Sequence, residues 1–393
     1  MNYTEKYFIE LLRGFVTDSI PKLNNDNVDE QELLELSRRH NIRAIVAYMT
    51  EKSEHTFSDD TEKILQKSYD NTVMQMINRE ACALLLCRRL SSEKIPHILF
   101  KGITVSETYP VKELRTFGDV DIIVRAEDDD RIRKMMADQG YSRSVTDGGT
   151  VTVYDRGREH YELHTALNVS ILENQTYFAD IWNNVQLRSG TTYAFEHNFH
   201  LSYLISHIEK HVKGGGAGIK MYLDIALYIR KYKDQIDLDR VREIMVGCNL
   251  GGFLSTVLYL CNRWFSLEIP QWVEPIEEDV YEKMCDFTLA GGIFGAEGEK
   301  NNLKSALNAQ VQSGRRGARF RLLLGRVFPP FRELSRLYPA YEGKPLLAPV
   351  AWSQHIFCVV RGGKLSRIRE IATADVASAQ EKADFLESIG SGK

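Results

Sequence analysis

Two aspartates, Asp119 and Asp121, stand one residue apart inside the apolar run Phe117–Val124. Aspartate is depleted in strands, because its short side chain competes for backbone hydrogen bonds. Side chains alternate across a strand, so both carboxylates would lie on one face and repel each other unless a cation lies between them. Mg²⁺ is bound by one or two carboxylates together with substrate phosphates. The pair therefore predicts a metal clamp at the end of a buried strand, and the alternative is an exposed pair on an edge strand.

Cationic and flexible residues precede the aspartates. Lys101-Gly102 follows the apolar run 95–100. A glycine lets backbone N–H groups approach a phosphate closely, so this turn is a candidate phosphate-binding element. Arg115 would neutralise phosphate charge or order the loop before the strand; the alternative is an ordinary surface arginine.

A third carboxylate follows in Tyr161-Glu162-Leu163-His164. Glu162 and His164 share a face if this segment is a strand, by the alternation that pairs the aspartates. Glu162 could then complete a metal site or accept a proton, and the alternative is an exposed charge on a hairpin strand. For His164 we favour a structural or substrate-orienting role over metal ligation.

The hydrophobic periodicity divides the chain into three blocks, which are an N-terminal helical region (1–93), an α/β core (94–190) and a C-terminal helical region (191–393). The predicted fold class is therefore α+β, with a short mixed sheet between two helical regions. The long apolar period of 61–90 predicts a helix packed in the core. Within the core block the pattern predicts strands at 97–100, 119–124, 150–154 and 160–166, and helices at 103–109 and 127–139.

The candidate residues belong to a series of short motifs between roughly residues 30 and 361. They are Leu99-Phe100-Lys101-Gly102, Tyr109-Pro110, Leu114-Arg115, Gly118-Asp119-Val120-Asp121, Glu162-Leu163-His164, His207, Leu223-Asp224, Phe328-Pro329-Pro330, Tyr338-Pro339 and the segment 346–352. With them the chain resembles the large bacterial family of "nucleotidyltransferase family proteins", part of the polymerase-β-like nucleotidyltransferase superfamily. In that superfamily a strand, a glycine turn and a helix precede the Asp-x-Asp strand, and a third acidic residue comes from a later strand.

This resemblance implies transfer of a nucleoside monophosphate from an NTP, such as ATP, to an acceptor hydroxyl, with release of pyrophosphate. The acceptor would be a small molecule, a protein or an RNA end, and the C-terminal helical region would shape its pocket. Two Mg²⁺ ions, or Mn²⁺ in their place, would be the cofactors. The alternative is a catalytically silent module of the same fold that binds or regulates. The implied residues are Asp119, Asp121 and Glu162 (catalytic and metal-binding), Lys101, Gly102, Thr104, Arg115 and Lys220 (nucleotide-binding), and His164, His207 and Asp224 (acceptor site).

One position departs from the family pattern. The superfamily usually has glycine followed by glycine or serine at the turn, whereas Ile103 follows Gly102 here. The usual hydroxyl contact to the triphosphate would therefore have to come from Thr104, Ser106 or Lys101. Lys220 ends the glycine-rich segment 213–220, which is a candidate phosphate loop or, in the simpler interpretation, a plain turn between helices.

Composition limits the partners of the protein. The 393 residues carry a net charge of −4, and 43% of them are hydrophobic, as in an ordinary soluble protein. No apolar run is long enough for a membrane helix and the first residues lack a signal-peptide pattern, so we expect a cytoplasmic protein without a membrane partner. An arginine-rich, aromatic segment at 315–338 would suit a nucleic acid, but the acidic balance disfavours one. A protein partner stays open.

Three histidines, His200, His207 and His211, fall on one face of a predicted helix. His207 and His211 have the i, i+4 spacing of a zinc pair, but the residues between them do not form His-Glu-x-x-His. Histidines at the mouth of a cleft or inside the core are the simpler interpretation, and the sequence leaves a metal on this face open.

Overall fold

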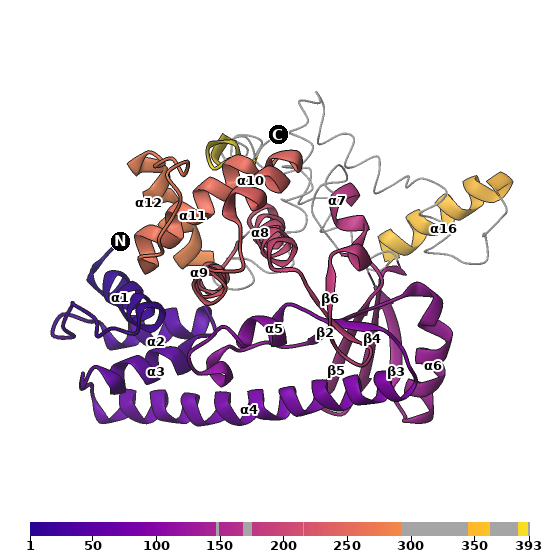
Figure 1. Cartoon of the computed structure of the whole chain (residues 1–393), viewed down its shortest axis with the longest axis horizontal. Helices are drawn as coiled ribbons and strands as arrows, with labels where there is room; N and C mark the ends of the chain where they lie inside the picture. The colour runs from indigo at the N-terminus through magenta and orange to yellow at the C-terminus, as the bar shows by residue number, and fades with distance from the viewer. Residues whose placement is uncertain (147–148, 168–174, 215, 292–344, 362–383, 392–393) are drawn as a thin grey trace. The chain divides into compact units, whose positions relative to one another are not determined.

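The computed structural model describes residues 1–146, 149–167, 175–214, 216–291, 345–361 and 384–391 (Figure 1). The chain divides into two compact units, one formed by 1–212 and 216–296 and the other by 213–215 and 297–393. In the second unit the structure describes the 3₁₀ turn Pro345–Leu347 and helix α16 (Ala348–Arg361). The arginine-rich segment at 315–338 lies outside the described residues. All candidate site residues lie in the first unit.

The first unit begins with helices, as predicted: α1 (Tyr3–Thr17), α2 (Glu30–Arg39), α3 (Arg43–Lys52) and α4 (Asp59–Ser92). The start of α1 is fixed by a capping box, in which Asn2 and Glu5 bond each other's backbone N–H groups. Asp29 caps α2 in a similar way through the N–H of Glu32. Helix α1 packs on α3 and on the later helix α11 (Gly251–Phe265), so the two ends of this unit share a core.

Helix α4 runs along one side of the unit from the N-terminal helices to the sheet (Figure 1). Only part of its predicted apolar period is buried. Leu65 and Met76 lie in the core, but the side chains of Ile77 and Leu84 are each 47% exposed, so the prediction that the whole period packs inside was wrong. A helix of 34 residues lies against one neighbouring layer, so residues on its far side stay in solvent whatever their type.

A seven-stranded mixed sheet follows, with the order β3-β4-β5-β2-β1-β7-β6. Its centre is formed by β2 and β5, which pair in parallel, while β1 joins β2 antiparallel and β7 in parallel. The strands are β1 (His97–Leu99), β2 (Val120–Val124), β3 (Ser142–Thr146), β4 (Val151–Arg156), β5 (Glu159–His164), β6 (Val185–Ser189) and β7 (Thr192–Phe195). A mixed sheet flanked by helices confirms the predicted fold class.

Four of these strands were predicted from the sequence, and three were missed. β3 and β6 lie at the two edges of the sheet. The sequence of β3, Ser-Arg-Ser-Val-Thr, has a single apolar residue. In β6, Val-Gln-Leu-Arg-Ser, two apolar residues alternate with polar ones over four positions only. All five side chains of β3 are exposed. The short helices α5 (Gly102–Ser106) and α6 (Asp129–Asp138) occupy the two predicted helical stretches of the core block.

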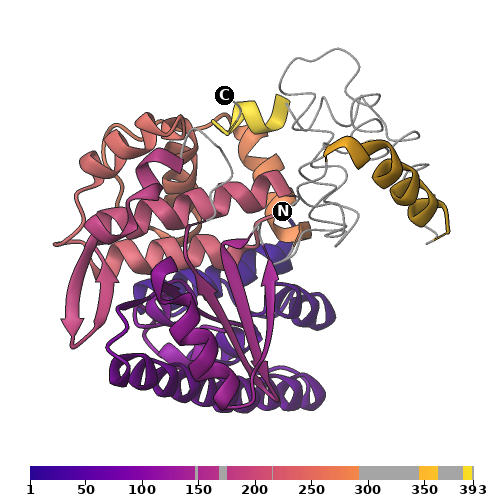
Figure 2. The ribbon, with the colours of Figure 1, turned by 90° about the vertical axis from the view of Figure 1, so that its right-hand side faces the viewer.

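The two faces of the sheet have different neighbours. On one face Val120, Ile122 and Val124 of β2 join a core with α4 and α6 residues such as Leu86 and Met136. On the opposite face Phe100 contacts Tyr203 of helix α8 (His197–Gly214). Figure 2 shows the strands between α4 on the lower side and the later helices above. Strand alternation therefore turns Asp121 toward α8.

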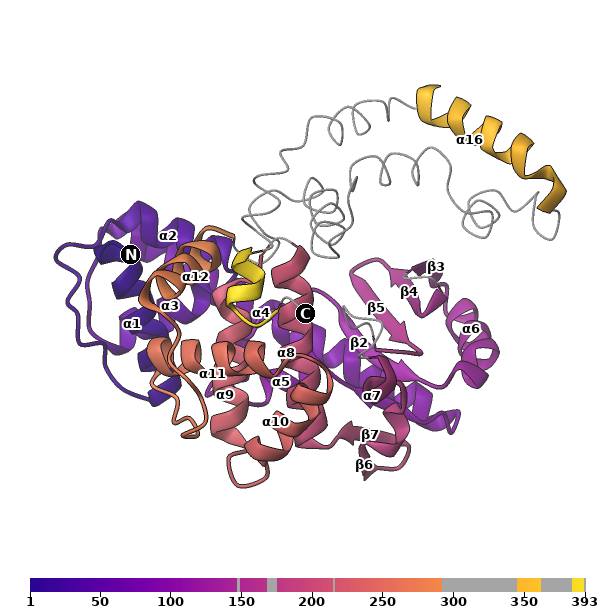
Figure 3. The same ribbon diagram turned by 90° about the horizontal axis from the view of Figure 1, so that it is seen from above.

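Helices α8, α9 (Ile219–Lys231), α10 (Leu238–Gly247), α11 and α12 (Glu278–Gly291) complete the first unit. Helices α8 and α9 lie between the N-terminal helices and the sheet (Figure 3). Among the described residues, no helix is both long and apolar enough to cross a membrane.

Candidate functional site

The register of β2 and β5 brings the central carboxylates together. Asp121 pairs with Glu162, and Ile123 pairs with His164, in a parallel ladder. Paired residues of adjacent strands point to the same face, so Asp121, Glu162 and His164 converge. One ligand atom from each lies within 4.8 Å of the others, and this is the one such group of three or more found in the part of the chain that the structure describes.

Asp121 lies at the centre of this group and is 3% exposed. Its Oδ1 accepts hydrogen bonds from Lys101 Nζ at 2.8 Å and from His164 Nε2 at 2.9 Å. Burial by itself would raise the pKa of Asp121, but the charges and hydrogen bonds of Lys101 and His164 outweigh it and lower the pKa to about 2. Asp121 is therefore an ionised carboxylate that accepts hydrogen bonds from an ammonium and an imidazole group.

His164 joins the two carboxylates. Its Nε2 lies 3.4 Å from Oε2 of Glu162 as well as against Asp121. Burial works against a charged imidazole, yet the two carboxylate contacts raise the pKa of His164 above its ordinary value. The same contact lowers the pKa of Glu162, chiefly through the hydrogen bond from His164. The position of His164 fits an orienting role, and its Nε2 also belongs to the group that could ligate a metal.

Asp119 lies one residue before β2 and is half-buried. Its pKa is raised, first by burial and then by the like charges of Asp121 and Glu162. Asp119 is not part of the compact group of ligand atoms. The electrostatic repulsion among these three carboxylates is the feature that a bound cation would relieve.

A cavity of about 420 Å³ opens beside Asp119 and Asp121. A volume in this range suits a nucleotide-sized ligand. Glu162, His164 and Thr104 are not among the described residues that line it. Its wall is formed by Asn41, Lys101, Gly102, Arg115, Thr116, Phe117, Gly118, Asp119, Asp121, Leu204, His207, Ile208, His211, Gly218, Lys220, Met221, Asp224 and Ile225.

The glycine turn contributes Lys101 and Gly102 to this wall, but not its hydroxyl side chains. Thr104 is buried, and its Oγ1 has no hydrogen-bond partner among the described residues. Ser106 Oγ donates to the carbonyl of Ile103 at 2.7 Å within the short helix. The Lys101 ammonium and the Gly102 backbone are therefore the parts of this turn that face the cavity.

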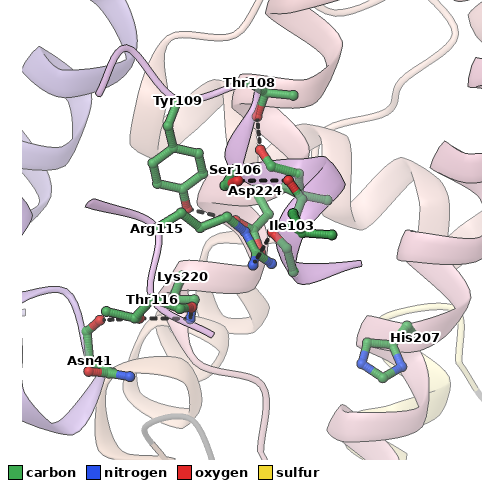
Figure 4. Close-up of polar contacts among 12 residues, drawn as sticks. Asn41, Ile103, Ser106, Thr108, Tyr109, Arg115, Thr116, His207, Lys220 and Asp224 are labelled. Atoms are coloured by element: carbon green, nitrogen blue, oxygen red, sulfur yellow. Dashed lines mark hydrogen bonds and ion pairs between the residues drawn. The ribbon is translucent and has the colours of Figure 1, made fainter. Parts of the chain in front are cut away.

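Arg115 and Asp224 are engaged with each other (Figure 4). The guanidinium donates from Nε to Oδ1 at 2.9 Å and from Nη2 to Oδ2 at 2.8 Å. Its Nη1 donates to the carbonyl of Gly102 at 2.9 Å, and Tyr109 Oη donates to Asp224 Oδ1 at 2.6 Å. Arg115, predicted to bind the nucleotide, and Asp224, predicted for the acceptor site, thus form one buried ion pair on the cavity wall.

Lys220 makes a second connection between α9 and the segment before β2. Its Nζ donates to the carbonyl oxygen of Thr116 and, at 3.0 Å, to Thr116 Oγ1. Thr116 Oγ1 donates in turn to the carbonyl of Asn41 at 2.8 Å. Burial is the main cause that lowers the pKa of Lys220 to about 8, and the charge of Arg115 adds to it.

The three histidines of α8 do not act together. His207 and His211 line the cavity with their Nε2 atoms 3.2 Å apart. His200 is buried and bonds the hydroxyl of Tyr228 at 3.1 Å instead. Burial lowers the pKa of both cavity histidines, His211 to about 4, so both imidazoles are neutral at pH 7. Figure 4 shows His207 well separated from the Arg115 network.

Sequence reasoning gave no role to four residues that the structure brings to this wall or its support, namely Asn41, Tyr109, Thr116 and Phe117. Tyr109 belongs to the Tyr109-Pro110 motif of the family resemblance, and this motif was the one sequence feature that pointed to it. Asn41 contributes its backbone carbonyl. Its φ of 54°, just past the end of α2, suits asparagine better than most residues, so its type was a weak local signal.

A comparison with protein-family models matches residues 26–266, more than half of the chain, to the family described as "Uncharacterised nucleotidyltransferase". The matched range contains Lys101, Asp119, Asp121, Glu162 and Asp224. Neither the curated proteins nor the solved structures give a match. The chain belongs to this uncharacterised nucleotidyltransferase family.

Proposed function

We propose that this protein is a Mg²⁺-dependent nucleotidyltransferase, which moves a nucleoside monophosphate from an NTP to an acceptor hydroxyl and releases pyrophosphate. One observation carries the proposal, namely that Asp121 pairs with Glu162 and contacts His164 beside a cavity that Asp119 and Lys101 also line. Family membership supports the same chemistry. The cytoplasm, which supplies NTPs, is the proposed location.

The donor set fits a hard divalent cation. Carboxylate oxygens are the ligands that Mg²⁺ and Mn²⁺ take in proteins. Burial first, and then the like charges of Asp121 and Glu162, raise the pKa of Asp119, and a bound cation would relieve this repulsion. Asp119, Asp121 and Glu162 would hold two such ions. When bound, the metal neutralises charge on the reacting phosphate and on the leaving pyrophosphate.

The protein's own groups would bind and orient the reactants. The Lys101 ammonium, the Gly102 backbone and Lys220 line the cavity as partners for the triphosphate. The acceptor oxygen forms a bond to the α-phosphorus while the bond to the bridging oxygen of the β-phosphate breaks. Glu162, ionised at neutral pH as a glutamate ordinarily is, would take the hydroxyl proton, and His164 contacts both Glu162 and Asp121.

The acceptor would bind at the wall formed by α8 and α9. We place His207 there, because its neutral imidazole can both donate and accept a hydrogen bond with a hydroxyl group. The C-terminal helical region would thus shape the acceptor pocket, as proposed for residues 191–393. A small molecule, a protein and an RNA end are all candidate acceptors.

A catalytically silent nucleotide-binding module is the second candidate. One observation favours it, since the Lys101 ammonium already pairs with the Asp121 carboxylate that the metal would need. In a silent module this lysine would replace the metal. The two candidates differ in whether nucleotide binding requires Mg²⁺.

Isothermal titration of each NTP with and without Mg²⁺ tests the proposal. We expect the wild type to bind one NTP only with the metal present, and the Asp119→Ala/Asp121→Ala double variant to lose that binding. Asp128→Asn is a matched control, because Asp128 is a buried carboxylate paired with Arg131 away from the cavity. Binding that ignores Mg²⁺ would support the silent module, and no binding to any NTP would overturn both candidates.

A further inference from the structure

The turn at the base of the cavity has an unfavourable backbone conformation. Lys101 has φ 51° and ψ −121°, a backbone region that residues other than glycine rarely adopt. Such a conformation is strained and persists only where the surrounding structure holds it. Lys101 Nζ nevertheless reaches Asp121 at 2.8 Å. The contacts that hold this turn therefore also hold an ammonium group in the site.

Two contacts hold the neighbouring Gly102. A Cβ atom on Gly102 would lie 2.8 Å from the ring of Phe117, so the backbone packs directly against that ring. The carbonyl of Gly102 accepts a hydrogen bond from Arg115 Nη1 at 2.9 Å. Arg115 and Phe117 both belong to the segment that leads into β2. This segment therefore fixes the turn by one hydrogen bond and one packing contact.

Arg115 is in turn held by α9. It is 7% exposed, and Asp224 accepts two of its hydrogen bonds across 109 residues of sequence. Tyr109 adds a third donor to the same carboxylate. A buried guanidinium needs such a partner, because an unpaired charge in the interior is strongly destabilising. The contacts form a continuous path from Asp224 through Arg115 and Gly102 to Lys101.

We propose that Arg115 and Asp224 are positioning residues, which hold the strained Lys101–Gly102 turn in the conformation that receives the triphosphate. The inference rests on the proposed function, because it assumes that phosphates bind at this turn. It assigns neither residue a direct contact with substrate. Helix α9 of the C-terminal helical region would thereby set the geometry of the phosphate-binding turn, although the two elements are distant in sequence.

Two variants weaken the path without removing a cavity-filling side chain. Asp224→Asn keeps the shape but removes the charge opposite Arg115, and Tyr109→Phe removes one donor to Asp224. Asp128→Asn is the matched control, since it neutralises a buried, ion-paired aspartate elsewhere. Each protein is compared with the wild type in two measurements. One is hydrogen exchange of the backbone amides of residues 100–106, and the other is the Kd of the NTP that the wild type binds with Mg²⁺. Both measurements are made well below the unfolding temperature.

We expect Asp224→Asn to speed hydrogen exchange at residues 100–106 and to raise the Kd of the NTP about tenfold. Tyr109→Phe should raise this Kd less. The control Asp128→Asn should change neither the exchange nor the Kd. A purely structural role would lower the melting temperature and leave both readouts unchanged, and this result would overturn the proposal. If Asp224→Asn does not fold, Tyr109→Phe decides by the same two readouts. If the wild type binds no NTP, the proposed function is refuted. If the wild type binds an NTP and the folded variants show the same Kd and the same hydrogen exchange, the positioning role alone is refuted.

Discussion

Lys101 Nζ lies 2.8 Å from Oδ1 of Asp121, so a lysine of the glycine turn provides positive charge to the central carboxylate of the site. Both groups are mostly buried, with side-chain exposures of 19% and 3%. The pKa of Lys101 is raised although burial opposes this, because Tyr203, Asp121 and Asp119 favour the charged ammonium. A divalent cation at Asp121 would therefore compete with this lysine, and a triphosphate would draw it away.

Lys101→Met should change metal and nucleotide binding in opposite directions. Without the ammonium, Asp121 is open to a cation, and Mn²⁺ alone should bind several-fold more tightly by electron paramagnetic resonance titration. The Mg²⁺–NTP complex should bind about tenfold more weakly, because the phosphates lose a charged partner. Lys112→Met, at an exposed ion pair with Glu80, is the control. Parallel changes in both affinities would contradict competition at Asp121.

The backbone strain at Lys101 is measurable by comparing two substitutions that both remove the ammonium. Lys101→Gly should be more stable than Lys101→Ala by about 1 kcal/mol in urea unfolding, because glycine adopts positive φ without a Cβ penalty. The φ of 51° at this position is the basis for the difference. Equal stabilities would show that the turn relaxes once the lysine is lost.

Glu162→Gln tests the proton acceptor. Glutamine keeps the shape but cannot take a proton, so the rate of pyrophosphate release at saturating Mg²⁺ and nucleotide should fall by at least about 10²-fold. Glu159→Gln on the same strand is the control, because Glu159 bonds Tyr141 and Arg156 instead of the site. A loss of less than threefold would leave Glu162 with a structural role.

Lys220 should give nucleotide binding a dependence on alkaline pH. Its pKa is lowered to about 8, mainly by burial, so the ammonium is charged below that pH and becomes neutral above it. The affinity for the Mg²⁺–NTP complex should therefore fall several-fold between pH 7 and pH 9, as roughly expected for the loss of one charged phosphate partner. Lys220→Arg, which stays charged throughout, should flatten this profile. An unchanged profile in the arginine variant would assign the dependence to another group.

His200 should reduce stability in mild acid. It is 2% exposed, and burial is the main cause that lowers its pKa to about 3. The unfolded chain binds a proton at this residue below roughly pH 6.5, while the folded protein does not, so stability falls as pH drops from there toward 3. The titration of His200 lowers the free energy of unfolding by at most about 1.4 kcal/mol per pH unit in this range.

His200→Phe removes this titration and keeps an aromatic ring in the core. Tyr228 retains a hydrogen-bond partner in His197 at 2.9 Å, and His200 Nε2 has no partner among the described residues to lose. Urea unfolding at pH 7 and pH 5 should show a smaller acid loss in the variant than in the wild type. An equal loss would assign the acid sensitivity to the other buried histidines.

The central part of the site could be predicted because strand geometry is local. Alternation along β2 fixes which side chains share a face, and Val120 and Ile122 on the buried side identify the strand from its sequence. A similar local pattern identified β5 and Glu162. The edge strand β3 could not be found in this way, since it has a single apolar residue and all five of its residues are exposed. β6 has a short apolar alternation, Val-Gln-Leu-Arg, which the prediction missed.

The roles of single residues around that centre were harder to predict. Arg115 was expected to neutralise phosphate charge or to order the loop before the strand, and the family resemblance implied an acceptor-site role for Asp224. The structure gives them a common ion pair. Side-chain chemistry by itself does not say which of several suitable partners a buried charge will meet, because that depends on how distant elements pack.

The sequence by itself determined that Asp121 lies on a buried strand, that Asp119 stands close to it and that a glycine turn precedes them, since all three follow from contacts within a few residues. The predicted strand 119–124 begins one residue later, at Val120, so Asp119 lies just outside it. Only the tertiary structure decided that Lys101 and His164 meet at Asp121, and that Asp224 of α9 holds Arg115. These partners come from separate elements. Their meeting depends on the order of strands in the sheet and on the packing of α8 and α9 over one face, which no local pattern specifies.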